Sequence, residues 1–417
     1  MVPKGWKTVT LKDLLDGQIK NGYSPNATNS ETGYWVLGLG ALADEGIISS
    51  EIKPVLPEKK VLQSLLKKDD FLVSRSNTPD KVGRSIRFKN EVENCSYPDL
   101  MMRFRIDDNK ADKEFIEHQL KSSAVRIYFK NCAAGSSSTM VKINKGILEK
   151  TPIVAPPIKE QKKIAQILST WDKAITVTEK LLTNSQQQKK ALMQQLLTGK
   201  KRLLDERGVR FSGEWEKGKF CDMANIDTGY AFKSKDFTQS DSGIPIIRMS
   251  DFKTGGLDVL GAAKVDRDSV NGLDKFKLRV GDFVFGMSGS LNNYGRVEKK
   301  DLPCYLNQRV GRILAKECAN QAFITYLYLS DSIQQSILDK AAGAAQLNIS
   351  ISDLRSMVVY YPCIEEQQKI AAVLSVADAE ISTLEKKLAC LKDEKKALMQ
   401  QLLTGKRRVK VDEAVAE

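Results

Sequence analysis

The chain has 417 residues, of which 65 are Lys or Arg and 52 are Asp or Glu, so its formal charge near neutral pH is +13. This length allows two or three domains that each bury a core, and the basic surface favours a polyanionic partner. No apolar run approaches the roughly 18 to 20 residues that span a bilayer, and MVPKGWKTVT has no signal-peptide core, so we expect a cytoplasmic protein without membrane contact.

Residues 1–155 have the pattern of a globular α/β domain of the α+β kind. The short β-like runs YWVLGL, FLVSR and MMRFRI alternate with turn-rich loops, and DKEFIEHQLKSS has the pattern of a helix. We therefore predict a first globular domain over residues 1–155.

Residues 156–206 carry the signals of one long helix. The segment follows Pro156 and Pro157, has Glu160 in its first turn and reaches Gly199 before a basic run. Its apolar residues recur at the spacing of a coiled-coil seam: Leu168, Trp171, Ile175, Leu182, Leu192 and Leu196. Thr178 and Ser185 interrupt this seam in its middle. A helix of 40 residues would be about 60 Å long.

Residues 207–361 are predicted to repeat the first domain. The β-like runs are now IPIIRMS, FVFGM and RVGRIL, and the helical stretch is QAFITYLYLSDSIQQSIL. Short elements recur in the same order: Trp6 with Trp215, Gly22-Tyr23 with Gly229-Tyr230, Asp70-Phe71 with Asp282-Phe283, Gly83-Arg84 with Gly295-Arg296, and Phe115-Ile116 with Phe323-Ile324. A duplicated scaffold whose surface has diverged explains this order.

Residues 362–408 form the second predicted helix, and 409–417 form a C-terminal tail. KKALMQQLLTGK occupies 189–200 and again 395–406, and 24 of 41 positions are identical between 160–200 and 366–406. The second seam comprises Leu374, Ala377, Ile381, Leu384, Leu388, Leu391, Leu398 and Leu402. Because the other faces are polar, neither helix can bury its seam alone, and we predict that the two pack as an antiparallel coiled coil. The chain would then have pseudo-twofold internal symmetry.

Basic residues in the loops and strands of both domains are candidates for DNA binding. Arginine paired with guanine is the commonest base-specific contact, and lysines commonly bind phosphates. Two similar domains on a spacer of fixed length suit two short sequences at a fixed separation. The candidates are Arg75, Lys81, Arg84, Arg87, Arg103, Arg105, Arg248, Arg296, Lys299, Lys300, Arg309 and Arg312.

The order domain, helix, domain, helix resembles that of the specificity subunit of type I restriction-modification enzymes. The resemblance covers nearly the whole chain and is carried by Pro-x-x-x-Glu-Gln-x-x-Ile-Ala-x-x-Leu at 156–168 and 362–374, and by two LLTGK ends. It implies that each globular half is a target-recognition domain for one part of a bipartite site in double-stranded DNA, with the helix pair as spacer.

The same resemblance implies partners and cofactors. Two adenine-N6 methyltransferase (M) subunits would dock near the helices, and motor-nuclease (R) subunits would join the assembly. S-adenosylmethionine, ATP and Mg would belong to those partners, so we expect no cofactor in this chain.

The residues needed for catalysis are sparse, and we predict no catalytic residue and no metal site. His118 is the single histidine, the seven cysteines contain no CxxC pair, and no GxxxxGK[ST] phosphate loop occurs. We therefore expect a non-enzymatic recognition subunit.

Two alternatives stay open. Pro98-Asp99 followed by Asp108-Asn109-Lys110 resembles a magnesium nuclease pattern, in which Asp99 and Asp108 hold the metal and Lys110 assists hydrolysis. A non-catalytic coiled-coil scaffold protein is the other, and it predicts no salt-sensitive DNA binding.

Overall fold

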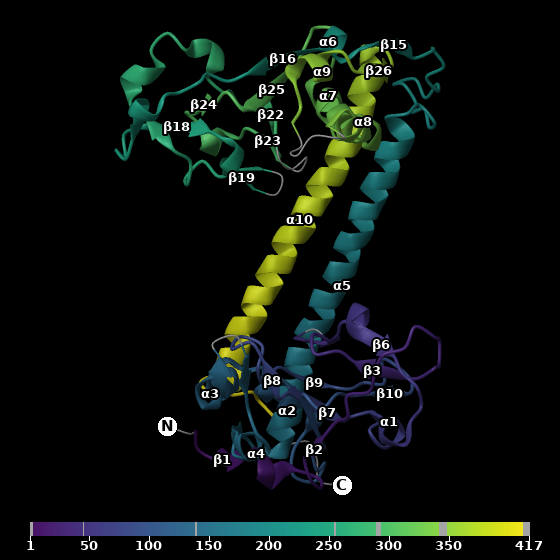
Figure 1. The fold of residues 1–417 in the computed structure, drawn as a ribbon, viewed down its shortest axis with the longest axis vertical. Helices are drawn as coiled ribbons and strands as arrows, with labels where there is room; N and C mark the ends of the chain where they lie inside the picture. The colour runs from purple at the N-terminus through teal and green to yellow at the C-terminus, as the bar shows by residue number, and fades with distance from the viewer. Residues whose placement is uncertain are drawn as a thin grey trace. The chain divides into compact units, whose positions relative to one another are not determined.

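The computed structural model describes residues 3–44, 46–137, 140–253, 256–288, 293–341 and 348–411. The chain divides into unit 1, Met1–Glu179 with Lys386–Glu417, and unit 2, Lys180–Glu385. Two 39-residue helices, α5 (Ile158–Leu196) and α10 (Ile364–Leu402), each contribute to both units (Figure 1). The division between the units falls inside both helices, between residues 179 and 180 and between residues 385 and 386. Residues 412–417 of the predicted tail lie outside the described residues.

The domain of unit 1 is built on a four-stranded antiparallel sheet in the order β2-β11-β7-β9. Its strands are β2 (Lys20–Asn21), β11 (Met101–Phe104), β7 (Phe71–Ser74) and β9 (Ser85–Arg87). Central β7 is buried on both sides. Phe71 and Val73 join one apolar cluster and Leu72 the other, as the alternation of side chains along a strand requires.

Smaller elements complete this domain. One three-stranded sheet joins β10 (Cys95–Ser96), β3 (Trp35–Leu37) and β6 (Ile52–Pro54), and another joins β12 (Ala134–Ser137), β13 (Met140–Lys142) and β8 (Ser76–Asn77). Two strand pairs complete the set: β1 (Lys7–Thr10) with β14 (Pro152–Ala155), and β4 (Leu42–Ala43) with β5 (Gly46–Ile47). The helices are α1 (Lys59–Gln63), α2 (Lys113–Lys121), α3 (Ser123–Cys132) and α4 (Lys145–Glu149), with 3-10 turns at Leu11–Leu14 and Ser49–Glu51.

Unit 2 repeats this architecture. Its four-stranded antiparallel sheet has the order β16-β25-β22-β23, from β16 (Ala224–Thr228), β25 (Val310–Ala315), β22 (Phe283–Gly286) and β23 (Tyr294–Arg296). A second sheet joins β17 (Phe237–Thr238), β21 (Lys264–Val265), β18 (Ile244–Ile247) and β24 (Tyr305–Leu306). In both units this second sheet has one parallel pair, β3 with β10 and β18 with β24.

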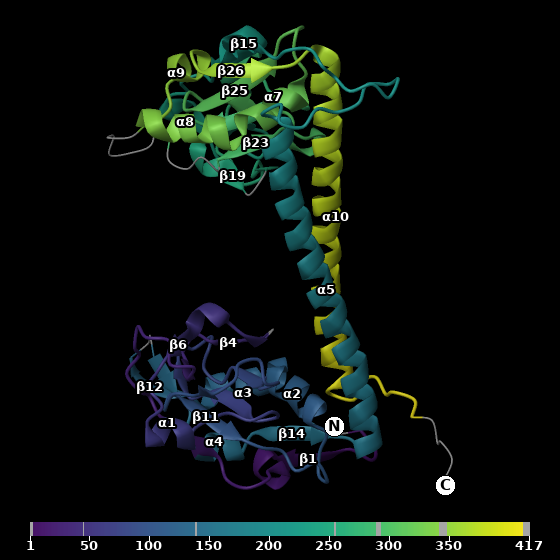
Figure 2. The ribbon, with the colours of Figure 1, turned by 90° about the vertical axis from the view of Figure 1, so that its right-hand side faces the viewer.

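The remaining elements of unit 2 are also short. β15 (Glu216–Lys219) pairs with β26 (Val358–Tyr361), and β19 (Phe252–Lys253) with β20 (Gly256–Leu257). The helices are α6 (Phe220–Met223), α7 (Gln321–Tyr328), α8 (Asp331–Ala341) and α9 (Ile351–Arg355). Figure 2 shows α7 beside β25. 3-10 turns lie at Ser234–Asp236, Met249–Asp251, Arg267–Val270, Asp274–Phe276 and Lys299–Asp301.

Both domain cores include the ends of the long helices. In unit 1, Leu168 of α5 and Leu402 of α10 lie in one apolar cluster with Phe115 of α2. In unit 2, Leu196 and Leu374 lie in the equivalent cluster with Phe323 of α7. Each domain is therefore completed by the start of one helix and the end of the other.

The predicted antiparallel packing of the helices is confirmed within each unit. In unit 1, Asp172 and Glu179 of α5 pair with Lys395 and Lys392 of α10. In unit 2, Ser185 and Lys189 of α5 bond to Glu380 and Asp378 of α10. Within each unit, partner numbers on α10 fall as those on α5 rise. None of the described helices is both long and apolar enough to cross a membrane.

The seam residues of both helices are either buried or half-buried. Buried are Leu168, Ile175, Leu196, Leu374 and Leu402, while Trp171, Leu182, Leu192, Ala377, Ile381, Leu384, Leu388, Leu391 and Leu398 are half-buried. Thr178 and Ser185 are also buried, and their hydroxyls are satisfied: Thr178 donates to the carbonyl of Ala174 (2.8 Å) and Ser185 to Glu380 (3.1 Å). Polar residues therefore pack in this seam because they have partners there.

The glycines of the repeated elements Gly22-Tyr23 and Gly229-Tyr230 are required for the same structural reason. A Cβ on Gly22 would lie 2.1 Å from the carbonyl oxygen of Tyr97, and a Cβ on Gly229 would lie 2.1 Å from that of Leu306. Backbone passes too close for any side chain at either position.

One predicted equivalence is wrong. The strand register places Arg296 opposite Phe283, and it places Arg87 opposite Phe71. Because Phe71 and Phe283 are equivalent, Arg296 matches Arg87 and not Arg84. Gly83 instead has φ +72°, and its missing side chain makes room for Phe129.

Candidate nucleic-acid interface

In each unit an arginine-glutamate clamp joins the segment after one long helix to the first turn of the other. In unit 2, Arg202 beyond the end of α5 donates two hydrogen bonds to Glu366 in the first turn of α10 (2.7 and 2.6 Å). In unit 1, Arg408 beyond the end of α10 donates two to Glu160 of α5 (2.7 and 2.8 Å). These hydrogen bonds raise the pKa of Arg202 and of Arg408. The clamp explains the glutamate of the repeated motif.

The glutamine of the repeated motif joins each long helix to a helix of the domain. Gln161 donates to the carbonyl of Pro156 (2.8 Å) and accepts from the backbone amide of Asp112 (2.9 Å), which is the N-cap of α2. Gln367 donates to Pro362 (2.9 Å) and accepts from Asn320 (3.0 Å), the N-cap of α7. The same side chain thus fixes the start of two helices.

The residue that lies beside the aspartate of the helix seam differs between the two units. Asp172 and Lys395 lie near the buried His118, whose Nε2 is 3.9 Å from Asp172. Burial lowers the pKa of His118 to about 4, although the Asp172 carboxylate opposes this shift. In unit 2 the matching position is Tyr326, which donates to Asp378 at 2.6 Å.

Two of the predicted DNA-binding arginines are equivalent residues inside the domains. Arg103 lies 3.4 Å from the buried Asp70 and donates to the carbonyl of Leu65 (3.0 Å). Arg312, with 7% of its surface exposed, lies 3.4 Å from Asp282 and donates to the carbonyl of Lys277 (3.1 Å). These contacts account for both arginines without a ligand, because an unpaired buried carboxylate would be costly.

Four other predicted residues also have acidic partners. Arg87 pairs with Asp69, Glu114 and Glu117. The remaining pairs are Arg105 with Asp70 (2.6 Å), Arg248 with Asp251 (3.4 Å) and Lys300 with Glu298 (2.7 Å).

The other half of the predicted set has no carboxylate within ion-pair distance among the residues that the structure describes. Its members are Arg75, Lys81, Arg84, Arg296, Lys299 and Arg309, all exposed or half-buried. Arg75 directly follows β7, and Gly83, between Lys81 and Arg84, bonds to Ser74 at the same end of the sheet. Arg309 lies at the equivalent end in unit 2, where its carbonyl accepts from Met287 directly after β22. Unpaired cations thus occur at matching sheet ends in both units.

The nuclease alternative places its three residues in local contacts. Asp99 accepts a hydrogen bond from Ser24, Asp108 pairs with Lys113 (2.8 Å), and Lys110 lies 3.6 Å from Asp107. Within the described residues, no group of three His, Cys, Asp or Glu side chains is arranged to hold a metal ion.

The chain matches one family model twice. The type I restriction modification DNA specificity domain matches residues 3–184 and 212–392. Both matches include a globular domain and most of the helix that follows it.

Relatives match over similar lengths. The type I restriction enzyme MjaVIII specificity subunit of Methanocaldococcus jannaschii is 26% identical and covers 98% of this chain and 94% of its own length. The EcoBI specificity subunit of Escherichia coli is 24% identical, covering 70% and 65%. The crystal structure of a type I restriction-modification S subunit from M. genitalium superposes with a TM-score of 0.60 at 16% identity, covering 95% and 96%.

Proposed function

We propose that this chain, which belongs to the type I restriction modification DNA specificity family, acts as the DNA-recognition subunit of such a system. Each unit recognises one part of a bipartite target in double-stranded DNA. The observation that carries this proposal is the pair of family matches, one for each half of the chain. The clamp recurs in both units, whereas the basic surface residues differ between them.

The six unpaired cations are the proposed DNA contacts. Arg75, Lys81 and Arg84 would serve the first half-site, and Arg296, Lys299 and Arg309 the second. An arginine without an internal carboxylate can give all its donors to phosphate or guanine, whereas Arg103 and Arg312 are already bound.

Chemistry is proposed to come from partner subunits. The chain would position two adenine-N6 methyltransferase subunits and the motor-nuclease subunits, which supply S-adenosylmethionine, ATP and Mg. The local pairs of Asp99, Asp108 and Lys110 support a non-catalytic role, because each of these charges has a partner in its own domain.

The decisive test is a genome-wide map of N6-methyladenine. Cells that express this chain with the methyltransferase of its own system are compared with cells that express the methyltransferase alone. We expect a new split motif only in the first strain. The scaffold alternative predicts identical maps in both strains, and that outcome would reject the proposal.

The helix pair is proposed to set the spacing of the two half-sites. Deleting seven residues from the middle of both helices keeps the heptad phase. We expect the methylated motif to keep both half-sites and to shorten its spacer. An unchanged spacer in a folded variant would reject this role for the helices.

A further inference from the structure

In each unit a three-residue turn leads into a strand of the four-stranded sheet. We call it the sheet-end turn, and it spans residues 98–100 before β11 and 307–309 before β25. The two turns are equivalent, because β11 pairs with β7 and β25 pairs with β22 in the same register. In unit 1 the turn lies at the end of the sheet where Arg75 follows β7.

Matching backbone hydrogen bonds hold the two turns. The first carbonyl of each turn accepts from the strand residue that follows the turn, and the last carbonyl accepts from the residue that follows β7 or β22. These bonds run from Met101 to Pro98 (3.0 Å) and from Arg75 to Leu100 (2.8 Å) in unit 1, and from Val310 to Asn307 (2.9 Å) and from Met287 to Arg309 (3.1 Å) in unit 2. The backbone of the turn is therefore the same frame in both units.

The side chains on this frame have nothing in common. They are Pro98-Asp99-Leu100 in unit 1 and Asn307-Gln308-Arg309 in unit 2. Asp99, Gln308 and Arg309 are exposed. Within the part of the chain that the structure describes, the side chains of Gln308 and Arg309 have no hydrogen-bond or ion-pair partner. Asp99 accepts from the hydroxyl of Ser24 through Oδ1 alone. Each turn thus presents unused polar groups to the solvent.

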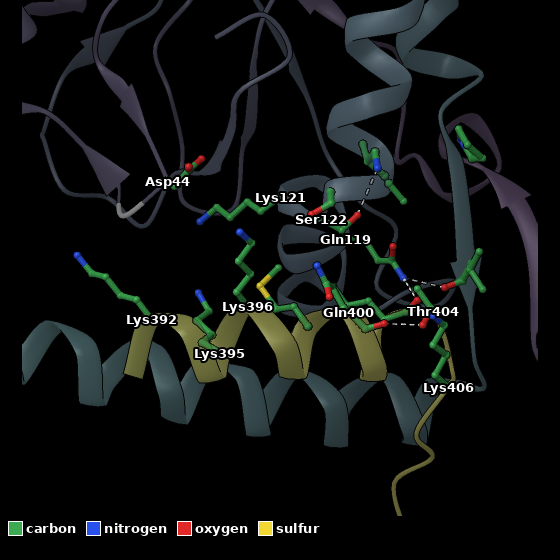
Figure 3. Close-up of a pocket in the computed structure, with 17 residues that line it drawn as sticks. Asp44, Gln119, Lys121, Ser122, Lys392, Lys395, Lys396, Gln400, Thr404 and Lys406 are labelled. Carbon is green, nitrogen blue, oxygen red and sulfur yellow. Dashed lines mark hydrogen bonds between the residues drawn. The ribbon is translucent and has the colours of Figure 1, made fainter. Parts of the chain in front are cut away.

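Other exposed residues of the two units have stayed identical. Figure 3 shows Lys395, Lys396, Gln400 and Thr404 around a cavity beside the end of α10, and all four recur unchanged 206 positions earlier in the chain. Exposure alone therefore does not explain why the sheet-end turns differ at every position. A fixed backbone with different side chains is the arrangement expected of loops that contact two different ligands.

The charges on the turns favour contact with bases over contact with phosphates. Asp99 takes the place of Gln308, and a carboxylate is repelled by a phosphate, whereas it can accept a hydrogen bond from the amino group of a base. Arg75 and Arg84 lie at the same end of the sheet in unit 1 and offset the charge of Asp99 toward DNA. Both turns can therefore approach the groove of a duplex.

We propose that the sheet-end turn reads bases of its half-site in the major groove, and that the two turns select different bases. A glutamine side chain pairs with N6 and N7 of adenine, an arginine pairs with O6 and N7 of guanine, and a carboxylate accepts from N4 of cytosine. Gln308 and Arg309 therefore select an adenine and a guanine in one half-site, and Asp99 selects a cytosine in the other. This inference rests on the proposed function and names base contacts that the function requires.

The test compares the DNA motifs of single-residue variants of the full chain, each expressed with the methyltransferase of its own system. N6-methyladenine is mapped first, and the purified complexes then compete for duplexes in which each base pair of the motif is replaced in turn. We expect Gln308→Ala to lose the requirement for an adenine and Arg309→Ala to lose that for a guanine in the same half-site. Asp99→Asn should lose the requirement for a cytosine in the other half-site. At each relaxed position the preference for the wild-type base should fall about tenfold or more.

The matched control removes the same two side-chain types at exposed positions of unit 2 outside the turn. Gln187→Ala with Arg210→Ala should keep the motif and the preference at every position. Should Gln308→Ala fail to fold, Gln308→Met keeps the size of the side chain and removes its donors and its acceptor. We expect Gln308→Met to relax the same adenine.

Three outcomes separate the failures. If the wild-type chain produces no split motif, the proposed function fails and the inference with it. If wild type produces a split motif and the turn variants stay as selective as wild type at every position, only the inference is overturned. If a turn variant binds all duplexes more weakly but keeps their ranking, the turn contacts phosphate or supports the domain, and the inference is again overturned.

Discussion

Unit 1 and unit 2 share the contacts between each globular domain and the long helices. They differ in the basic residues on the surface that is proposed to bind DNA. The clamps Glu160–Arg408 and Glu366–Arg202 have nearly the same geometry. In contrast, Arg87 pairs with three carboxylates, whereas its equivalent Arg296 has none within reach in the described part of unit 2. The frame is therefore constrained by folding, and the basic surface is free to differ between the half-sites.

The clamps themselves differ in burial, which gives the largest predicted contrast. Both glutamate side chains are buried, with 0% of Glu366 and 5% of Glu160 exposed, but the arginines differ, with 20% of Arg202 and 47% of Arg408 exposed. Arg202→Ala strands a buried carboxylate, so we expect a loss of about 2 to 3 kcal/mol of unfolding free energy after allowance for solvent. Arg408→Ala should lose clearly less, because Arg408 is more exposed and Glu160 keeps the hydrogen bond from the indole N–H of Trp6. Urea denaturation of both variants measures this, and equal losses would mean that burial does not separate the clamps.

The second contrast is in pH dependence. His118 has a pKa lowered to about 4, so between that value and the ordinary value near 6.5 the unfolded chain binds the extra proton. The stability from neutral His118 is thus complete above pH 6.5 and declines as the pH falls, by about 2 kcal/mol at pH 5. Its surroundings include Asp172, Glu117, Lys121 and Lys395.

The matched variant is His118→Tyr, which introduces the residue found at the equivalent position of unit 2. Thermal midpoints at pH 7 and pH 5 should differ less for this variant than for wild type. An identical pH dependence in both proteins would show that His118 does not contribute to it.

The third contrast separates one hydrogen bond from the packing of a tryptophan. Trp6 donates its indole N–H to Glu160 at 3.2 Å, while the buried indole N–H of Trp215 has no partner among the described residues. Both Trp→Phe changes remove the same volume. We expect Trp6→Phe to cost about 1 to 2 kcal/mol more than Trp215→Phe, because the lost bond is to a carboxylate. Chemical denaturation of both variants measures this difference, and equal costs would mean that the indole hydrogen bond contributes nothing.

The fourth contrast concerns Arg296 and Arg87. Arg87→Ala should destabilise unit 1 by about 1 kcal/mol through its carboxylate partners. Arg296→Ala should leave stability unchanged and lower the slope of log affinity against log salt by about 1, if Arg296 binds a phosphate. Salt titrations of DNA binding measure the second effect, and an unchanged slope and affinity would remove Arg296 from the interface.

The two domains and the helix pair could be predicted from the sequence, because internal repeats indicate duplicated domains and heptad spacing indicates which residues pack between helices. The 206-residue offset indicated two domains, and the heptad leucines such as Leu374 and Leu402 indicated that the helices needed each other. The structure confirms both predictions. Polar positions such as Ser185 were harder to judge, since their burial depends on Glu380 from the opposite helix.

The candidate interface was less accessible, because charge alone does not tell whether an arginine is buried. Arg103 and Arg312 were predicted to bind DNA, and in the structure each pairs with an aspartate that precedes a central strand. A signal was present: Asp70-Phe71 and Asp282-Phe283 recur, and a repeated acid before an apolar strand needs an internal cation. The clamp could have been found in the same way, since Arg202 and Arg408 are also 206 residues apart.

The sharing of both helices between the units also sets an order of events during synthesis. Unit 2 is one continuous stretch, Lys180–Glu385, whereas unit 1 needs residues from both ends of the chain. At about 5 to 20 residues per second, a ribosome would need roughly 10 to 40 s to make the stretch that separates the two parts of unit 1. During that time Leu168 and its apolar neighbours lack the cover of Leu402 and Leu403. The domain that is translated first is therefore completed last, and the nascent N-terminal half is the part for which a chaperone would matter.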